Sequence, residues 1–198
     1  LWTIYYVGLL GFGLRFARHL IQLIKRIKIN PKLKSPYNIK VLLKEKLPPH
    51  TFFSYILLNK TKFEANAIPK AVLIHEEIHA QQYHSLDVLL IELVQVIFWF
   101  NPLIYLFKKS MKLNHEFLAD SAVLKSGLEK SAYQKILLAF SSNAAEPKLA
   151  NAITYSSIKK RFKVMKKRTS KKSIVFRSIL LLPLVTLLLF GFSERKFV

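Results

Sequence analysis

The chain has 198 residues, 52% of them hydrophobic, and carries 32 Lys and Arg against 11 Asp and Glu, a formal net charge of +21. This length allows one ordinary domain together with a few membrane segments. A basic chain can bind nucleic acid, but here the basic residues flank long apolar runs, as in cytoplasmic loops beside a membrane, so we expect no nucleic-acid partner. Because cysteine is absent, disulfides and thiolate metal sites are excluded.

The sequence begins with an almost wholly apolar run, LWTIYYVGLLGFGL at residues 1–14. A helix needs ~20 residues to cross the hydrocarbon core, so this run is predicted to be only the end of a membrane-spanning helix. Arg15 and Arg18 open a mixed apolar and basic stretch, which is predicted to continue the same helix. We assign residues 1–24 to the helix and this continuation, and expect the sequence to be part of a longer protein.

A second span is predicted at residues 174–192. Residues 159–172 before it hold nine Lys or Arg, and residues 193–198 after it hold two. The positive-inside rule therefore puts the start of this span, and the end of the first, in the cytoplasm. We predict a multi-pass protein of the inner membrane, in contact with lipid, whose residues 25–173 face the cytoplasm. Residues 193–198 are expected to begin a periplasmic part that is truncated or absent.

The intervening residues 25–173 predict a mainly helical domain with a small β-hairpin. Residues 31–36 are predicted to be a linker. Two segments rich in Val, Ile, Phe and Tyr, at 38–46 and 50–59, are separated by a proline pair and are predicted to be the strands of the hairpin. Pro69 is expected in the first turn of a helix, where its missing N–H costs little.

That helix contains HEEIH. His75 and His79 are four residues apart and share one helix face, so both imidazoles can bind the same metal ion. Glu76 can act as the general base of a zinc peptidase. An exposed charged helix with an accidental match is the alternative interpretation. Glu77 is a rival carboxylate, but it points in a different direction from the histidine pair.

A catalytic zinc ion takes a third protein ligand and keeps one position open. The segment NHEFLADSAVL supplies Glu116 and Asp120, one turn apart on one helical face. Glu116 is predicted to complete a His-His-Glu site. Asp120 is predicted to accept the free N–H of a ligand histidine without binding the metal. An ordinary carboxylate pair near a helix N-terminus is the alternative.

Three further histidines, His19, His84 and His115, are left out of the predicted site. A lone histidine is more often a surface or structural residue than a ligand. His84 lies nine residues after His75, which is the opposite side of a continuous helix.

A third apolar run, at residues 88–107, is long enough to span a bilayer. If it did, His79 and Glu116 would lie on opposite sides of the membrane and could not share a metal ion. Asn101-Pro102 favours a break after about 20 Å of helix. We therefore predict a helical hairpin at residues 88–113, buried in the core or dipping partway into the bilayer.

The segments HEEIHAQQYHSLD, WFNPLIYLFKK and NHEFLADSAVL, followed by a basic stretch and a last apolar run, resemble the BlaR/MecR-type membrane metallopeptidases, in a version like those of Bacteroidota. This family contains the antirepressor proteases of beta-lactam sensing. The resemblance implies a gluzincin-like zinc peptidase domain flanked by transmembrane helices. It also implies that His75, His79 and Glu116 are zinc ligands, that Glu76 is the base, and that Asp120 supports a ligand.

These observations predict a membrane-embedded endopeptidase with Zn2+ as cofactor and a protein or peptide as substrate. The expected role is regulatory, by cleavage of a transcriptional repressor or of the chain itself in transmembrane signalling. The strand around residues 53–58 is expected to bind the substrate by strand addition. The alternatives are a membrane quality-control protease of broad specificity and a non-catalytic transducer that keeps the peptidase fold.

Overall fold

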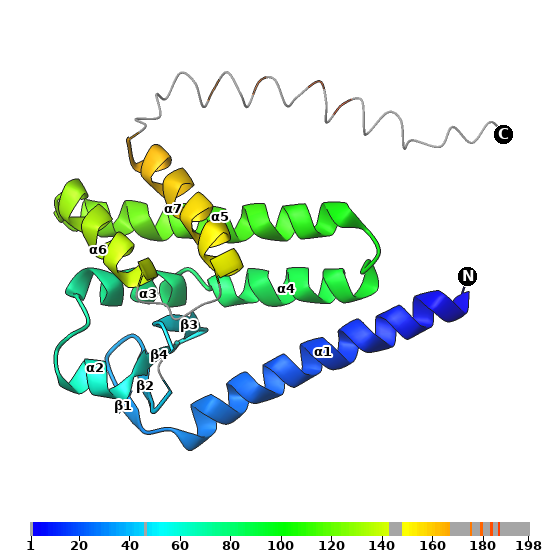
Figure 1. The fold of residues 1–198 in the computed structure, drawn as a ribbon, viewed down its shortest axis with the longest axis horizontal. Coiled ribbons are helices and arrows are strands. Elements are labelled where there is room, and N and C mark those ends of the chain that lie inside the picture. Colours follow the sequence, from blue (N-terminus) through cyan, green and yellow to red (C-terminus); the bar gives the residue numbers. More distant parts are fainter. Residues whose placement is uncertain are drawn as a thin grey trace. The chain divides into compact units, whose positions relative to one another are not determined.

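The computed structural model describes residues 2–45, 47–142 and 148–166, together with positions 175, 179, 183 and 186. The chain divides into two compact units, Leu1–Met165 and Lys166–Val198. The predicted span at 174–192 and the segment 193–198 lie, apart from those four positions, outside the described residues. The first unit contains the sheet and the helices that form the candidate site (Figure 1).

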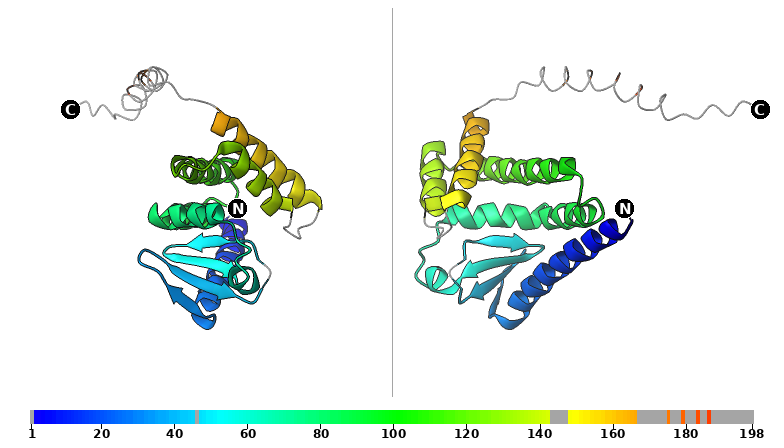
Figure 2. Two further views of the ribbon diagram at one scale, coloured as in Figure 1. Left: turned by 90° about the vertical axis from the view of Figure 1, so that its left-hand side faces the viewer. Right: turned by 45° about the vertical axis from the view of Figure 1, so that its right-hand side comes forward.

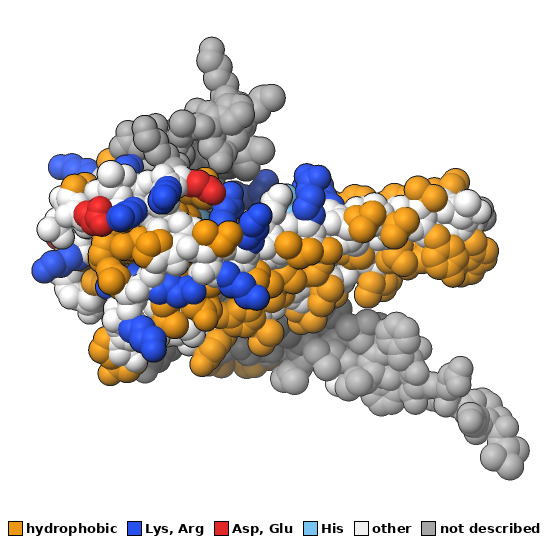
Figure 3. Space-filling model, turned by 90° about the horizontal axis from the view of Figure 1, so that it is seen from below, with side chains coloured by type: hydrophobic (Ala, Val, Ile, Leu, Met, Phe, Trp, Pro, Cys, Tyr) orange, Lys and Arg blue, Asp and Glu red, His pale blue; other side chains and the backbone are white. Residues whose placement is uncertain are grey.

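The first helix, α1, runs without a break from Trp2 to Ile29. At 1.5 Å per residue its length is about 42 Å, more than the ~30 Å of a hydrocarbon core. Within the described residues it is the one helix long and apolar enough to cross a membrane. Its apolar side chains are largely exposed, and hydrophobic side chains cover the end of the unit where α1 begins, at the right of Figure 3. Lys and Arg gather toward the other end.

Four short strands follow α1 and form one mixed sheet. In chain order they are β1 (Lys32–Lys34), β2 (Ile39–Leu43), β3 (His50–Phe52) and β4 (Tyr55–Asn59). Their order across the sheet is β1-β2-β4-β3. The central strands β2 and β4 are parallel, with Val41 opposite Leu57, whereas each outer strand is antiparallel to its neighbour.

The sheet contradicts two predictions from the sequence. Residues 50–59 are themselves a hairpin, because Phe53 adopts a left-handed conformation (φ 50°) in the two-residue turn between β3 and β4. Segment 38–46 therefore does not form a simple hairpin with 50–59, but contributes β2, which pairs with β4 in parallel. The predicted linker at 31–36 contains β1, which pairs with β2.

The central strands β2 and β4 bury side chains on both faces of the sheet, because successive side chains of a strand point to opposite faces. One face packs against α2 (Lys60–Glu64) and α3 (Lys70–Gln81), and the other against the end of α1. The buried strand residues are Leu42, Ile56 and Leu58 on the first face and Val41, Leu43 and Leu57 on the second. The sheet therefore fixes α3, the helix that carries HEEIH, from below (Figure 2).

Two longer helices follow α3 and lie antiparallel, side by side (Figures 1 and 2). They are α4 (His84–Ile97) and α5 (Pro102–Lys125). The side chain of Asn101 caps α5 by accepting a hydrogen bond from the N–H of Leu103 at 2.9 Å. The helical hairpin runs from His84 to Lys125 and is longer than the predicted 88–113. The 14 residues of α4 reach only about 21 Å, too short to span a bilayer.

The last two helices of the unit lie along one side of α3 and α5 (Figure 2). They are α6 (Lys130–Ser142) and α7 (Lys148–Lys166). Ala71 of α3, Val123 of α5 and Tyr133 of α6 form a buried cluster, to which Met165 of α7 adds. The HEEIH helix is therefore enclosed by the sheet below, by α5 above, and by α6 and α7 at the side (Figure 2).

The tip of the hairpin packs on α1 at Gly8. The indole of Trp99 stacks on Phe12 at a centroid distance of 5.9 Å, and its Nε1 donates to the carbonyl of Tyr5 at 3.3 Å. A Cβ atom on Gly8 would overlap this indole. The absence of a side chain at Gly8 is thus what lets α1 and the hairpin approach.

We expect Gly8→Ala to displace Trp99 and weaken the packing of α1 on the hairpin by about 1–3 kcal/mol, the usual cost of overpacking. Gly11→Ala is the matched control, because nothing lies within 4 Å of a Cβ there and alanine favours the helix. Trp99 emission in a Trp2→Phe background and the thermal unfolding midpoint report the effect. Equal emission and midpoints in the two alanine variants would contradict it.

Candidate active site

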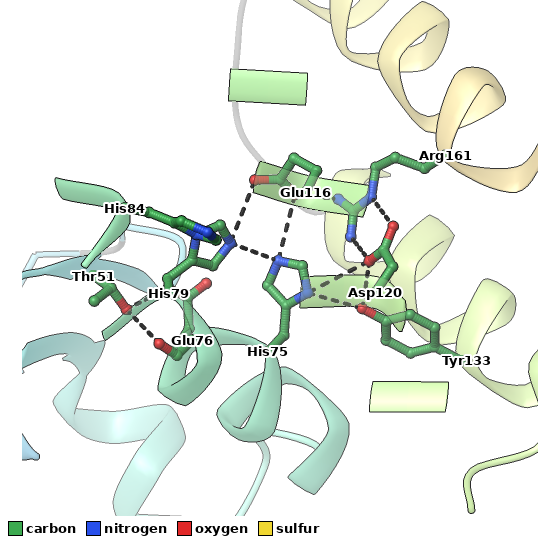
Figure 4. A network of polar contacts seen from close by, with 9 residues as sticks. All are labelled: Thr51, His75, Glu76, His79, His84, Glu116, Asp120, Tyr133 and Arg161. Carbon is green, nitrogen blue, oxygen red and sulfur yellow. Dashed lines mark hydrogen bonds and ion pairs between the residues drawn. The ribbon is translucent and has the colours of Figure 1, made fainter. Parts of the chain in front are cut away.

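Two helices bring His75, His79 and Glu116 to one point (Figure 4). The Nε2 atoms of the two histidines on α3 are 3.2 Å apart. The Glu116 carboxylate on α5 faces both, with Oε2 3.4 Å from Nε2 of His75 and Oε1 3.6 Å from Nε2 of His79. One ligand atom of each residue lies within 4.8 Å of the others. Two imidazoles and one carboxylate form a donor set that suits a divalent metal such as zinc.

The second ring nitrogen of His75 contacts a buried pair of polar groups. Its Nδ1 is 2.9 Å from the Tyr133 hydroxyl and 3.5 Å from Oδ1 of Asp120. The same hydroxyl donates to Oδ1 of Asp120 at 2.8 Å, so its oxygen can accept a hydrogen bond from Nδ1–H of His75. In this arrangement Nε2 of His75 is left without a proton and faces His79 and Glu116. Tyr133 is therefore the nearer partner, and Asp120 acts chiefly by holding Tyr133.

Arg161 of α7 joins the two carboxylates of α5. Its Nη1 is 2.7 Å from Oε2 of Glu116, and its Nε donates to Oδ2 of Asp120 at 2.8 Å while Nη2 bonds Oδ1. Burial alone would raise the pKa of Glu116, but the hydrogen bond with His75 and the charge of Arg161 outweigh it and lower the pKa to about 2. Glu116 is therefore ionised at neutral pH.

Burial shifts the pKa values of His79 and Glu76 in opposite directions. Burial lowers the pKa of His79 to about 3, so its imidazole is neutral and can bind a cation. Burial raises the pKa of Glu76, although His75 and a hydrogen bond from Thr51 act in the opposite direction. The Thr51 hydroxyl donates to Oε2 of Glu76 at 2.7 Å, which fixes the carboxylate beside the ligand cluster.

A cavity of about 630 Å3 contains the site. Glu76, His79 and Glu116 line it, together with residues of α1, β3, α4 and α5. Because β4 has neighbours on both sides of the sheet, the expectation of strand addition at residues 53–58 is wrong. The edge strand that lines the cavity is β3, through His50–Phe52.

The three histidines left out of the predicted site, His19, His84 and His115, all line this cavity. The prediction that His84 lies on the opposite side of the helix from His75 is wrong, because the helix is not continuous. α3 ends at Gln81, and Tyr83 adopts a left-handed conformation (φ 53°, ψ 32°) before α4 begins. The turn brings the His84 ring against that of His79, at a centroid distance of 4.8 Å.

Sequence reasoning also missed Thr51, Tyr133 and Arg161. Arg161 belongs to a stretch that the sequence marks only as basic, and Tyr133 stands in no motif. Both lie far along the chain from HEEIH, and they reach the site only through the packing of α6 and α7 over α5. Thr51 depends on the position of an edge strand that the sequence pattern assigns incorrectly.

The chain is mainly helical, with a small sheet. Two imidazoles and a carboxylate converge in it beside a buried glutamate. This is the architecture of a metallopeptidase. The sequence model of the BlaR1 peptidase M56 family matches residues 17–165. The chain therefore belongs to this family, and the resemblance noted from the sequence is confirmed. The family implies a metallopeptidase that acts on protein or peptide substrates.

A curated relative agrees with this assignment. The chain is 29% identical over 144 residues to the regulatory protein BlaR1 of Bacillus licheniformis. The matched region covers 70% of this chain and 22% of the relative. The chain thus spans about a fifth of the length of that protein and corresponds to a peptidase domain of the BlaR1 type.

Proposed function

We propose that this chain is a membrane-embedded zinc endopeptidase with a regulatory role. His75, His79 and Glu116 would hold the zinc ion, and Glu76 would be the catalytic base. The observation that carries the proposal is the convergence of these three side chains, within 4.8 Å of one another, beside a cavity that Glu76, His79 and Glu116 line. A zinc ion bound there would polarise the scissile carbonyl and acidify the attacking water.

Glu76 would carry out the proton transfers of the reaction. Its carboxylate takes a proton from the attacking water and passes it to the leaving amine. Burial raises its pKa, which makes it a stronger base than an exposed glutamate. The hydrogen bond from Thr51 to Oε2, at 2.7 Å, leaves Oε1 for the water. Glu76, held by Thr51 of β3, would therefore serve in turn as base and acid.

The substrate would bind as an extended segment along β3. This strand pairs with β4 on one side only, and His50, Thr51 and Phe52 line the cavity. Its remaining edge can accept a peptide backbone by strand addition. Because Thr51 of the same strand bonds Glu76, a peptide on this edge lies next to the catalytic carboxylate.

We further propose that the site faces the cytoplasm and that α1 and residues 174–192 span the inner membrane. The length and apolar surface of α1 and the basic residues at 159–172 support this topology. A repressor protein or the chain itself is the proposed substrate, in line with the name of the related regulatory protein BlaR1. A broad-specificity quality-control protease and a non-catalytic transducer are the competing functions.

The proposal is tested on protein purified in detergent. Elemental analysis should find a single zinc ion per chain, which is lost in the His75→Ala, His79→Ala double variant. Cleavage of casein should stop on treatment with a chelator and return on addition of zinc. His19→Ala is the control for the loss of a histidine outside the ligand set. Equal zinc content in wild type and the double variant would overturn the site, and wild type with bound zinc that cleaves no protein would favour the transducer.

The topology is tested by cysteine labelling, because the natural chain contains no cysteine. We expect single cysteines at Lys44 and Lys130 to react only when a membrane-impermeant maleimide reaches the cytoplasmic side. A cysteine at Ser193 is expected to react from the periplasm. If Lys44 and Lys130 were labelled from opposite sides, the hairpin of α4 and α5 would have to cross the membrane.

A further inference from the structure

The outer nitrogen of His79 has an unusual partner. Its Nε2 faces His75 and Glu116, so Nδ1 points away from the ligand cluster. This Nδ1 lies 2.8 Å from Nδ1 of His84. The two rings meet edge to face, at 73°. His79 therefore has both ring nitrogens engaged, one toward the ligand cluster and one toward His84.

His84 is itself held firmly. It is 5% exposed, and its ring stacks on that of His115, with centroids 4.0 Å apart and planes 8° apart. Nε2 of His115 lies 3.0 Å from Oδ2 of Asp87. We call the four residues His79, His84, His115 and Asp87 the histidine array. It joins the end of α3, the first turn of α4 and the middle of α5.

The backbone around His84 fixes the array in place. Tyr83 adopts a left-handed conformation, which costs free energy in a residue other than glycine. Ser85 anchors the other side of His84, because its hydroxyl oxygen accepts from the N–H of Phe53 at 2.8 Å. The first turn of α4 is thus tied to the turn between β3 and β4.

Hydrogen-bond chemistry decides what His84 can do. Only one proton can lie between two Nδ1 atoms that are 2.8 Å apart. If Nε2 of His79 binds a metal through its lone pair, the proton of His79 must be on Nδ1. Nδ1 of His84 is then the acceptor, and His84 carries its own proton on Nε2. Most ligand histidines instead donate to a carboxylate, a carbonyl or water.

We propose that His84 is the positioning residue for His79, fixing its tautomer and ring orientation. His115, which stacks on His84 and bonds Asp87, holds His84 in place. This inference rests on the proposed role of His79 as a ligand. It gives each histidine of HEEIH its own support: Tyr133 and Asp120 for His75, and the histidine array for His79. The two supports lie on opposite sides of the ligand cluster.

The test is the zinc affinity of purified protein, measured by competition with a chromophoric chelator. His84→Leu should bind zinc about 10–100-fold more weakly, the usual loss when the partner of a ligand is removed. His84→Gln should recover part of the loss, because its amide oxygen can accept a hydrogen bond from Nδ1–H of His79. His19→Leu makes the same change at a histidine outside the array and should retain wild-type affinity. Absorption spectra of the cobalt-substituted proteins should change in His84→Leu but not in His19→Leu.

The supporting pair is tested by a double-mutant cycle. Asp87→Asn should weaken zinc binding in the wild-type background and have no further effect in His84→Leu, because it acts through His84. Wild-type affinity and an unchanged cobalt spectrum in His84→Leu would overturn the proposal, as would additive effects of the two substitutions. Should His84→Leu fail to fold, His84→Gln and Asp87→Asn carry the test.

Failure of this inference is distinguishable from failure of the proposed function. If wild type binds zinc and His79→Ala abolishes binding, the ligand assignment stands, and the His84 variants test the array alone. If His79→Ala binds zinc as tightly as wild type, both the proposed function and the inference about His84 are overturned.

Discussion

Glu116→Ala is expected to lose both zinc and peptidase activity. Removing the carboxylate leaves two histidines for the metal and takes away one of the two carboxylates that pair with Arg161, whose guanidinium is 2.7 Å from Glu116. Because loss of an outer partner already costs about 10–100-fold in affinity, loss of the ligand itself should exceed about 100-fold. Chelator competition measures the affinity, and casein cleavage the activity.

Two further variants allow the zinc affinities to be ranked. Asp120→Ala should fall between wild type and Glu116→Ala in zinc affinity, because Asp120 supports His75 without binding the metal. It should also lower the free energy of unfolding by about 3–5 kcal/mol, since it leaves Arg161 buried without its main partner. Glu77→Ala is the control. A Glu116→Ala protein with full zinc occupancy and normal cleavage would mean that the third ligand lies elsewhere.

Glu76→Gln is expected to keep zinc and lose turnover. Glutamine has nearly the same shape as glutamate and can still bond Thr51, but it cannot take a proton from water. General-base catalysis contributes about 100–10,000-fold, so cleavage should fall by at least that range. Zinc affinity should stay within about threefold of wild type, because Glu76 is not among the three residues whose ligand atoms converge.

Glu77→Gln is the matched control for this variant, since it makes the same change one residue further along α3. Casein cleavage by Glu77→Gln should equal that of wild type. Cleavage by Glu76→Gln at the wild-type rate would remove Glu76 as the base. Loss of zinc in Glu76→Gln would instead assign it to the ligand set.

The parts of the site that the sequence predicts are those governed by helix geometry. A spacing of four residues puts His75 and His79 on one face of any helix, and the same rule pairs Glu116 with Asp120. Because His79 and Glu116 must lie on the same side of the membrane to share a metal ion, a break is predicted at Asn101-Pro102. α4 and α5 are separated there. Such inferences succeed because they depend on local geometry and one distance constraint.

The parts that escape prediction depend on backbone conformations or long-range packing that carry no local signal. Phe53 and Tyr83 both have positive φ, although neither is a residue type that favours it. One closes the hairpin of β3 and β4, and the other ends α3 and turns His84 toward His79. Tyr133 and Arg161 reach the site because α6 and α7 pack on α5, which periodicity alone does not specify.

The position of Arg161 has a thermodynamic consequence. One guanidinium from α7 binds Glu116 and Asp120 of α5, so docking of α7 would share an interaction with the proposed binding of metal by Glu116. Thermodynamic linkage makes this coupling reciprocal. If displacing α7 changes the metal affinity by some factor, metal binding changes the docking equilibrium of α7 by the same factor. Metal binding and docking of α7 are therefore expected to be coupled equilibria, so that a change in one should appear as a change in the other.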